Sequence, residues 1–137
     1  MSGLVIVVED EEPIRAALVR LLQSACYTVR AFASGKDFFN SPMPDTPACL
    51  LLDMQMPDID GLEATRRIRA DGRFDQLPIL AMTANASQAD KQECLEAGMN
   101  AHVSKPIDMQ QLLPNIKKWV KNQQLICRLL LTQKMAK

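Results

Sequence analysis

Five side chains that could bind a metal ion or a phosphate group follow short apolar runs in this chain of 137 residues. Glu9 and Asp10 come directly after "LVIVV" (4–8), and Asp53 comes after "ACLLL" (48–52). Thr83 ends the run 78–83, and Lys105 stands just past "AHVS" (101–104). Three carboxylates in one pocket repel each other, and a divalent cation removes that conflict. Mg²⁺ suits the set, because it binds a few carboxylates and also accepts phosphate oxygens.

The apolar runs alternate with amphipathic segments, which indicates strands and helices that alternate along the chain. We expect strands over 4–8, 27–32, 48–52, 78–83 and 101–104. The helical patterns start at Glu12, at Gly35, after Gly61, after a Ser87 cap and after an Asp108 cap. Such alternation requires parallel strands with right-handed crossovers, so we predict an α/β fold of five βα units whose sheet is covered on both faces. Sites in these sheets form at the carboxyl ends of the strands, which would bring the five side chains together.

Four motifs in this order carry a resemblance to a known family: "VVEDEE", "LLLDMQMPDIDG", "LAMTA" and "HVSKP". They resemble the receiver domain of two-component response regulators, over residues 4 to about 120. The resemblance implies a flavodoxin-like, doubly wound (βα)5 fold with strand order 2-1-3-4-5. It also implies that Asp53 is the phosphoacceptor, and that Mg²⁺ is bound by Glu9, Asp10, Asp53 and the backbone carbonyl of Gln55.

Further roles follow from the same resemblance. Thr83 would contact the phosphoryl group through its hydroxyl, and Lys105 would pair with it. Pro106 resembles the family's cis-proline. Gln55 and Asn85, two positions beyond Asp53 and Thr83, would tune the lifetime of the phosphoryl group.

His102 is the single histidine of the chain and stands where the family often carries an aromatic switch residue. Its other interpretation is a half-buried structural imidazole, and the sequence leaves both open. If His102 moves together with Thr83, the switch would respond to pH near the histidine pKa.

Composition sets the limits of the prediction. The formal net charge is zero, which gives no support to binding of nucleic acid or of an anionic membrane. The apolar runs are too short to span a bilayer and the first residues do not resemble a signal peptide, so we expect a cytoplasmic protein.

We expect a receiver domain over residues 1–121 and a C-terminal, helical extension over 122–137. No pair of cysteines has metal-binding spacing, and each is expected to be a small buried group: Cys26, Cys49, Cys94 and Cys127.

The expected partners are a histidine kinase or phosphotransfer protein, which supplies the phosphoryl group, and an output partner. The output partner would bind the face formed by helix 4, strand 5 and helix 5. We expect this face to include Ala101, His102, Val103, Met109 and the helix near Lys91 and Glu96. Phosphorylation-linked homodimerisation stays open. The first half of the chain is more similar to receivers joined to helix-turn-helix outputs, and the second half to receivers of hybrid histidine kinases.

Two other functions compete with this hypothesis. An α/β phosphohydrolase with an aspartate nucleophile commonly has a second acid two residues later, and here that residue is Gln55. A phosphorylation-independent interaction domain would keep the fold without the chemistry, and the complete set of acids, threonine and lysine argues against it. We therefore expect a phosphoacceptor signalling domain whose catalysis is confined to its own Asp53, not a metabolic enzyme.

Overall fold

The computed structural model describes residues 3–42, 48–56, 59–71, 76–84 and 88–121. Its centre is a five-stranded sheet of β1 (Leu4–Val8), β2 (Thr28–Phe32), β3 (Ala48–Asp53), β4 (Ile79–Thr83) and β5 (Ala101–Ser104). All neighbouring strands are parallel, and their order is β2-β1-β3-β4-β5. The predicted flavodoxin-like topology is therefore confirmed.

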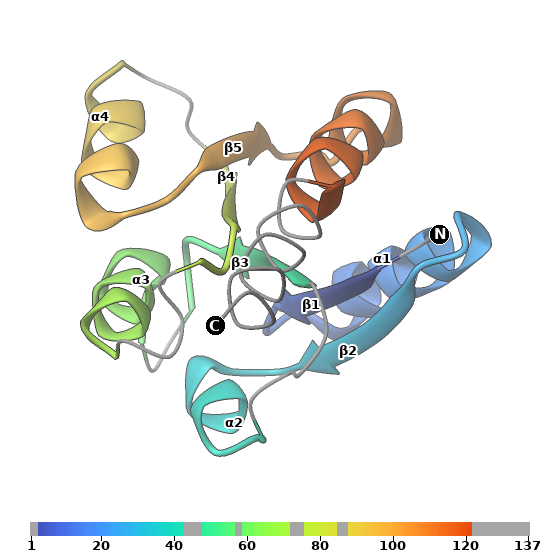
Figure 1. Ribbon diagram of the computed structural model, residues 1–137, viewed down its shortest axis with the longest axis horizontal. Helices are drawn as coiled ribbons and strands as arrows, with labels where there is room; N and C mark the ends of the chain where they lie inside the picture. The colour runs from blue at the N-terminus through green and yellow to red at the C-terminus, as the bar shows by residue number, and fades with distance from the viewer. Residues whose placement is uncertain (1–2, 43–47, 57–58, 72–75, 85–87, 122–137) are drawn as a thin grey trace, which may run out of the picture.

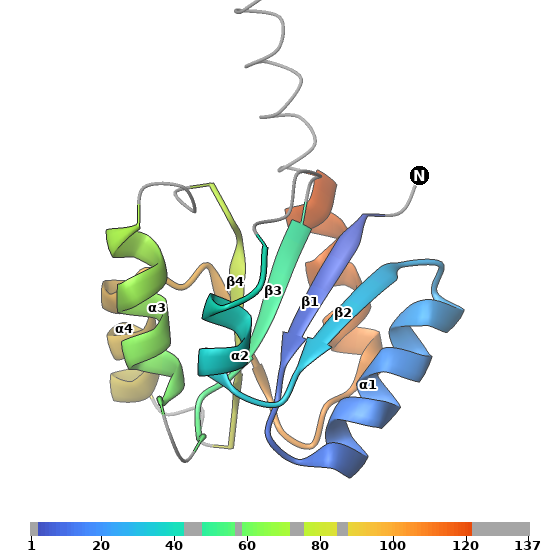
Figure 2. The same ribbon diagram turned by 90° about the horizontal axis from the view of Figure 1, so that it is seen from below.

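Helices cover both faces of this sheet (Figure 1). One face carries α2 (Gly35–Phe39), α3 (Gly61–Ala70) and α4 (Gln88–Ala97), and the other carries α1 (Glu12–Ser24) and a helix over residues 109–121 (Figure 2). Asp60 caps α3 with its carboxylate, which accepts a hydrogen bond of 2.8 Å from the Glu63 amide. No described helix combines the length and the hydrophobicity needed to cross a bilayer.

Successive residues of the central strands contribute to two separate cores, because side chains alternate between the faces of a strand. Ile6, Leu50 and Leu52 pack beneath α2, α3 and α4, whereas Val5, Val7 and Leu51 pack beneath α1 and the helix 109–121. A sheet buried on both faces requires apolar residues at every position. This requirement explains the uninterrupted runs that the sequence shows in β1, β3 and β4.

Two helices end in the same Schellman motif, in which the chain turns through one residue with positive φ. In α4 that residue is Gly98, with φ of 111°. In α1 it is Cys26, with φ of 72°, and the Tyr27 amide donates to the Leu22 carbonyl across 3.1 Å. The expectation that Cys26 is buried is wrong, since its position just past the helix end leaves it exposed. Cys49 and Cys94 are buried, and Cys127 lies outside the described residues.

The expected output face also needs a correction. Val103 is 3% exposed and belongs to the core beneath α1 and the helix 109–121. Met109 packs against the same core. Neighbouring His102 is partly exposed. The alternation of β5 thus removes Val103 from the surface that this strand presents.

Candidate functional site

Asp53 is the last residue of β3, and its carboxylate is held from two sides. Its Oδ1 accepts hydrogen bonds from Lys105 Nζ at 2.9 Å and from the Gln55 amide at 3.1 Å. Asp53 is 2% exposed. This degree of burial is high for a carboxylate at the edge of a sheet. It arises because Lys105 lies across the carboxylate.

Glu9 and Asp10 lie beside Asp53, as the sequence predicted. One oxygen from each of the three carboxylates lies within 4.8 Å of the others. Glu9 is fully buried and Asp10 is partly buried. The parallel pairing of β1 with β3 produces this arrangement, because it aligns Val8 with Leu52 and so brings the residues that follow them to one edge.

The ionised form of Glu9 is unfavourable in this cluster. Within the described part of the chain neither oxygen of its buried side chain has a hydrogen-bond partner. The pKa of Glu9 is raised from 4.5 to about 8, and burial is the largest cause of the rise. Asp53 adds to the rise through its charge and through a hydrogen bond that a protonated Glu9 can donate, and Asp10 adds through its charge; Lys105 acts in the opposite direction. A carboxylate of this kind needs either a proton or a cation beside it.

Lys105 is the cation that the chain itself supplies. Its amine is 2.9 Å from Asp53 Oδ1 and 3.8 Å from Glu9 Oε2. Burial lowers the pKa of Lys105, but the hydrogen bond to Asp53 and the nearby carboxylates outweigh burial, so the pKa is raised above 10.5. The Lys105 amide donates to the Thr83 carbonyl across 2.8 Å, and the bond from Lys105 to Pro106 is cis.

The four remaining predicted residues lie in different places. Thr83 ends β4, is 9% exposed, and lies beside Lys105 through the backbone bond just described. Gln55 is exposed next to Asp53. Asn85 lies outside the described residues. His102 does not join the acidic cluster and instead lines a separate cavity beside α4.

Two residues that support the site were missed by sequence reasoning. Arg15 donates through Nη1 to the carbonyls of Glu9 and Asp10, at 2.8 and 3.4 Å, and so fixes the turn that carries both acids. Its place in the first turns of α1, just after the acidic pair, was the available signal. Gly61 packs so closely on the end of β3 that a Cβ there would lie 2.8 Å from the Asp53 carbonyl oxygen.

The donor set fits a hard divalent cation. Carboxylate oxygens are the ligands that Mg²⁺ prefers, and three of them converge here. The Glu9 oxygens are the independent sign, because neither has a hydrogen-bond partner among the described residues and the Lys105 amine comes no closer than 3.8 Å. A buried carboxylate without hydrogen-bond donors is costly unless a cation compensates it. The residues present therefore fit a magnesium site.

A flavodoxin-like sheet with an acidic, lysine-paired cluster at the carboxyl ends of its strands defines the structural class of this protein. The family model of the response regulator receiver domain matches residues 5–117. The chain therefore belongs to the response regulator receiver domain family, and the resemblance seen in the sequence is confirmed.

Relatives of two kinds match the chain. Response regulator MprA from Mycobacterium ulcerans (strain Agy99) is 36% identical over 117 residues, which are 85% of this chain and 50% of that protein. Hybrid signal transduction histidine kinase L from Dictyostelium discoideum is 36% identical over 128 residues, which are 89% of this chain and 8% of that protein. The chain thus spans about half the length of MprA and a small part of the hybrid kinase.

Solved structures agree with the fold. Response regulator StyR superposes with a TM-score of 0.86 at 29% identity, covering 98% of this chain and 67% of that one. The receiver domain of sensor histidine kinase PA1611 from Pseudomonas aeruginosa PAO1 superposes with a TM-score of 0.76 at 32% identity, covering 88% of this chain and 99% of that one. That second structure has a magnesium ion coordinated in its active site cleft.

Proposed function

We propose that this protein is a phosphoacceptor signalling domain, in which Asp53 receives a phosphoryl group from a histidine kinase or phosphotransfer protein. The observation that carries the proposal is the Asp53 carboxylate, held by Lys105 at 2.9 Å and by the Gln55 amide within a cluster of three acids. An ionised carboxylate needs no separate base to act as a nucleophile.

The chain's own residues account for the transfer step. An oxygen of Asp53 attacks the phosphorus of a phosphohistidine in line, the P–N bond breaks, and an acyl phosphate forms while the imidazole leaves and takes up a proton. Lys105 neutralises charge on the transferred oxygens, and the Gln55 amide orients the carboxylate. The Thr83 hydroxyl would contact the phosphoryl group, and Gln55 and Asn85 would set its lifetime.

Glu9, Asp10, Asp53 and the backbone carbonyl of Gln55 would hold Mg²⁺ in this site. When bound, the ion supplies positive charge to the phosphoryl oxygens and relieves the repulsion between the acids. The magnesium ion in the receiver domain of PA1611 supports this part of the proposal.

A groove beside Lys105 offers a place for the phosphoryl donor to dock. It has a volume of about 320 Å³ and is lined by apolar residues of α1 and by the segment after β5: Pro13, Ile14, Ala17, Leu18, Leu21, Lys105, Pro106 and Ile107. Leu21 is 46% exposed there. Because Lys105 borders both the groove and Asp53, a donor seated in the groove would bring its phosphohistidine close to the carboxylate.

A charge introduced at Leu21 by substitution tests whether the phosphoryl donor docks in this groove. Leu21→Lys should slow transfer from a phosphohistidine protein and leave transfer from acetyl phosphate, which needs no protein contact, unchanged. Equal slowing with both donors would contradict docking in this groove.

The output would be a conformational switch in the cytoplasm, on the face formed by α4, β5 and the helix 109–121. Added negative charge beside Thr83 and Lys105 draws the threonine hydroxyl inward, and the repacking reaches His102 on β5. Amide chemical shifts recorded before and after phosphorylation test this step, which fails if the changes stay around Asp53.

The deciding experiment is incubation with Mg²⁺ and acetyl phosphate, followed by intact mass. We expect one added phosphoryl group on the wild type and none on Asp53→Ala. An unmodified wild type would favour the phosphorylation-independent interaction domain. Turnover of a simple phosphate ester that is lost in Asp53→Asn would instead favour the phosphohydrolase.

A further inference from the structure

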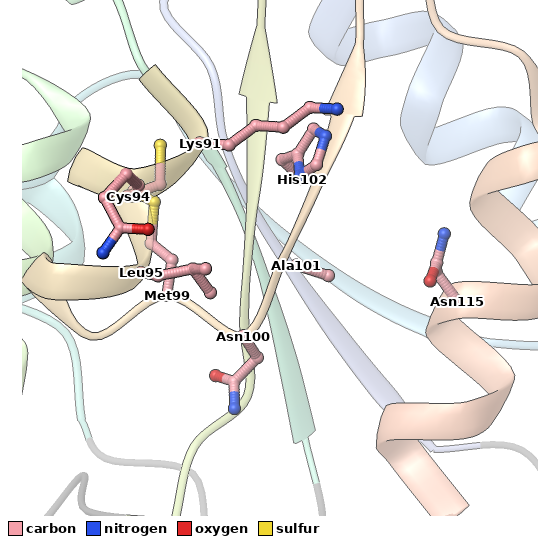
Figure 3. Close-up of a pocket in the computed structure, with 9 residues that line it drawn as sticks. Lys91, Cys94, Leu95, Met99, Asn100, Ala101, His102 and Asn115 are labelled. Atoms are coloured by element: carbon pink, nitrogen blue, oxygen red, sulfur yellow. The ribbon is translucent and has the colours of Figure 1, made fainter. Parts of the chain in front are cut away.

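A second cavity, of about 520 Å³, lies beside α4 and β5 and shares no residue with the acidic cluster. Its lining combines cationic, amide and apolar side chains, among them Lys91 and Leu95 of α4, His102 of β5 and Asn115 of the helix 109–121. Figure 3 shows the Lys91 amine and the His102 ring at one end of the cavity, with Asn115 on the opposite wall. The cavity thus lies on the face where we place the output.

Among the side chains that the structure describes, the basic groups of this cavity have no acidic counterpart. Among the described residues that line it, none is Asp or Glu, and Lys91 forms no ion pair within the described part of the chain. The described acids of α4, Glu93 and Glu96, are exposed and do not line it. A carboxylate from another molecule would supply the missing charge.

The described groups that face His102 from β4 and from the helix 109–121 are neutral. The helix 109–121 contributes the amide of Asn115, and β4 places Ala81 opposite His102 in the sheet register. Burial, and next the charge of Lys91, lower the pKa of His102 below its ordinary value. Lys91 is thus the charged side chain that the described structure sets against His102.

An exposed apolar side chain lies next to these basic groups. Leu95 also lines the cavity and is 57% exposed. Met99 lies beneath it and is buried. A partner that covers Leu95 would bury apolar surface one helical turn away from Lys91.

We infer that this cavity binds a segment of an output protein that presents a carboxylate to Lys91 and His102 and an apolar side chain to Leu95, with an affinity that rises as the pH falls. The output role of the segment rests on the proposed function, whereas the recognition chemistry rests on the cavity alone. The bound carboxylate favours protonated His102, so at mildly acidic pH the segment is bound together with a proton taken up from solvent.

The size of the pH effect follows from this linkage. Each unit by which the bound carboxylate raises the pKa of His102 changes the affinity up to tenfold between high and low pH. We expect an acidic segment to bind roughly five to ten times more tightly near pH 6 than near pH 8. A neutral segment of the same shape should show no such dependence.

The test is a titration of isotope-labelled protein with the peptide acetyl-Glu-Leu-Leu-Glu-amide, followed through amide chemical shifts at both pH values. The control peptide carries Gln in place of each Glu. We expect the acidic peptide to shift Leu95, Ala101 and His102 and to bind more tightly than the control. Lys91→Gln should weaken binding at both pH values, and His102→Gln should remove the pH dependence. Lys36→Gln on α2 removes the same charge far from the cavity and should change neither.

Three results would overturn the inference: equal binding of the acidic and neutral peptides, shifts that map to another surface, or no binding at millimolar peptide. A pH dependence that survives in His102→Gln would overturn the part assigned to that residue. Intact mass after acetyl phosphate treatment is recorded on the same samples. Phosphorylation of Asp53 without peptide binding would refute the proposed binding site and leave the proposed function standing. Peptide binding without phosphorylation would refute the proposed function and leave the binding site standing.

Discussion

Replacing Gly61 by alanine tests how closely α3 packs against the end of β3. The new Cβ would lie 2.8 Å from the Asp53 carbonyl oxygen and from Met54 Cα, and 2.9 Å from Met54 Sδ. The first two neighbours are backbone atoms of the strand that carries the phosphoacceptor. They cannot easily retreat, because the Met54 amide donates to the Met82 carbonyl of β4 across 3.0 Å.

The expected cost follows from these distances. Ordinary contacts of a Cβ begin at 3.4 Å, so the methyl group must displace the β3 backbone or α3 by about 0.6 Å. Overpacking of this kind costs about 1–3 kcal/mol, and the better helix propensity of alanine offsets at most about 1 kcal/mol of it. Because the displaced atoms include Asp53, we also expect the reaction with acetyl phosphate to slow by roughly tenfold or more.

Gly35→Ala is the matched control, since Gly35 also begins a helix and a Cβ there would meet no atom closer than 3.6 Å. Urea unfolding followed by circular dichroism should show Gly61→Ala to be less stable than wild type and Gly35→Ala to be equal or slightly more stable. The rate of mass increase with acetyl phosphate should fall in Gly61→Ala alone. The packing argument would be refuted if the two variants had equal stability, or if Gly61→Ala were phosphorylated at the wild-type rate.

Three further predictions concern the rest of the molecule. Cys26→Gly should raise the free energy of unfolding by about 0.5–1 kcal/mol, because glycine adopts the positive φ without strain; a lower urea midpoint would contradict this. Mg²⁺ at about a hundred times its dissociation constant should stabilise the wild type by about 2.7 kcal/mol, and Asp10→Asn should lose most of that gain in thermal melts. The lowered pKa of His102 means that the unfolded chain takes up the proton first as the pH falls below about 6.5, so the contribution of His102 to stability should decline from there downward. The raised pKa of Glu9 acts in the opposite direction, so the effect of His102 is measured as the difference between the wild type and a variant without this imidazole. His102→Gln should flatten that part of the stability profile, and an unchanged profile would speak against the burial of this imidazole.

The buried strands were predictable from the sequence for a physical reason, whereas the strand order was implied by the resemblance to the receiver family. A parallel sheet that is covered on both faces needs uninterrupted apolar runs, and such runs predict β1, β3 and β4. The end of each strand then fixes where Asp53 and Lys105 must lie relative to one another. Family membership is confirmed independently, whereas the roles assigned to Glu9, Asp10 and Thr83 stay predictions.

Features that depend on packing between distant segments could not be predicted in this way. The near-complete burial of Asp53 requires Lys105, 52 residues away, to lie across it. Cys26 occupies a turn position that usually takes glycine, so its residue type misled the prediction of burial. The error at Val103 arose because the sequence of the short strand β5 does not reveal which of its residues face the core.

The exposed Cys26 gives the molecule a natural attachment point for a spectroscopic label. Cys49 and Cys94 are shielded, and burial raises the pKa of the Cys49 thiol far above its usual range, so neither competes readily for a thiol reagent. With Cys127 replaced by serine, a fluorophore on residue 26 would sit at the end of the helix that carries Leu21. Its emission would then follow the arrival and departure of a docked donor in real time, without any new cysteine having to be introduced.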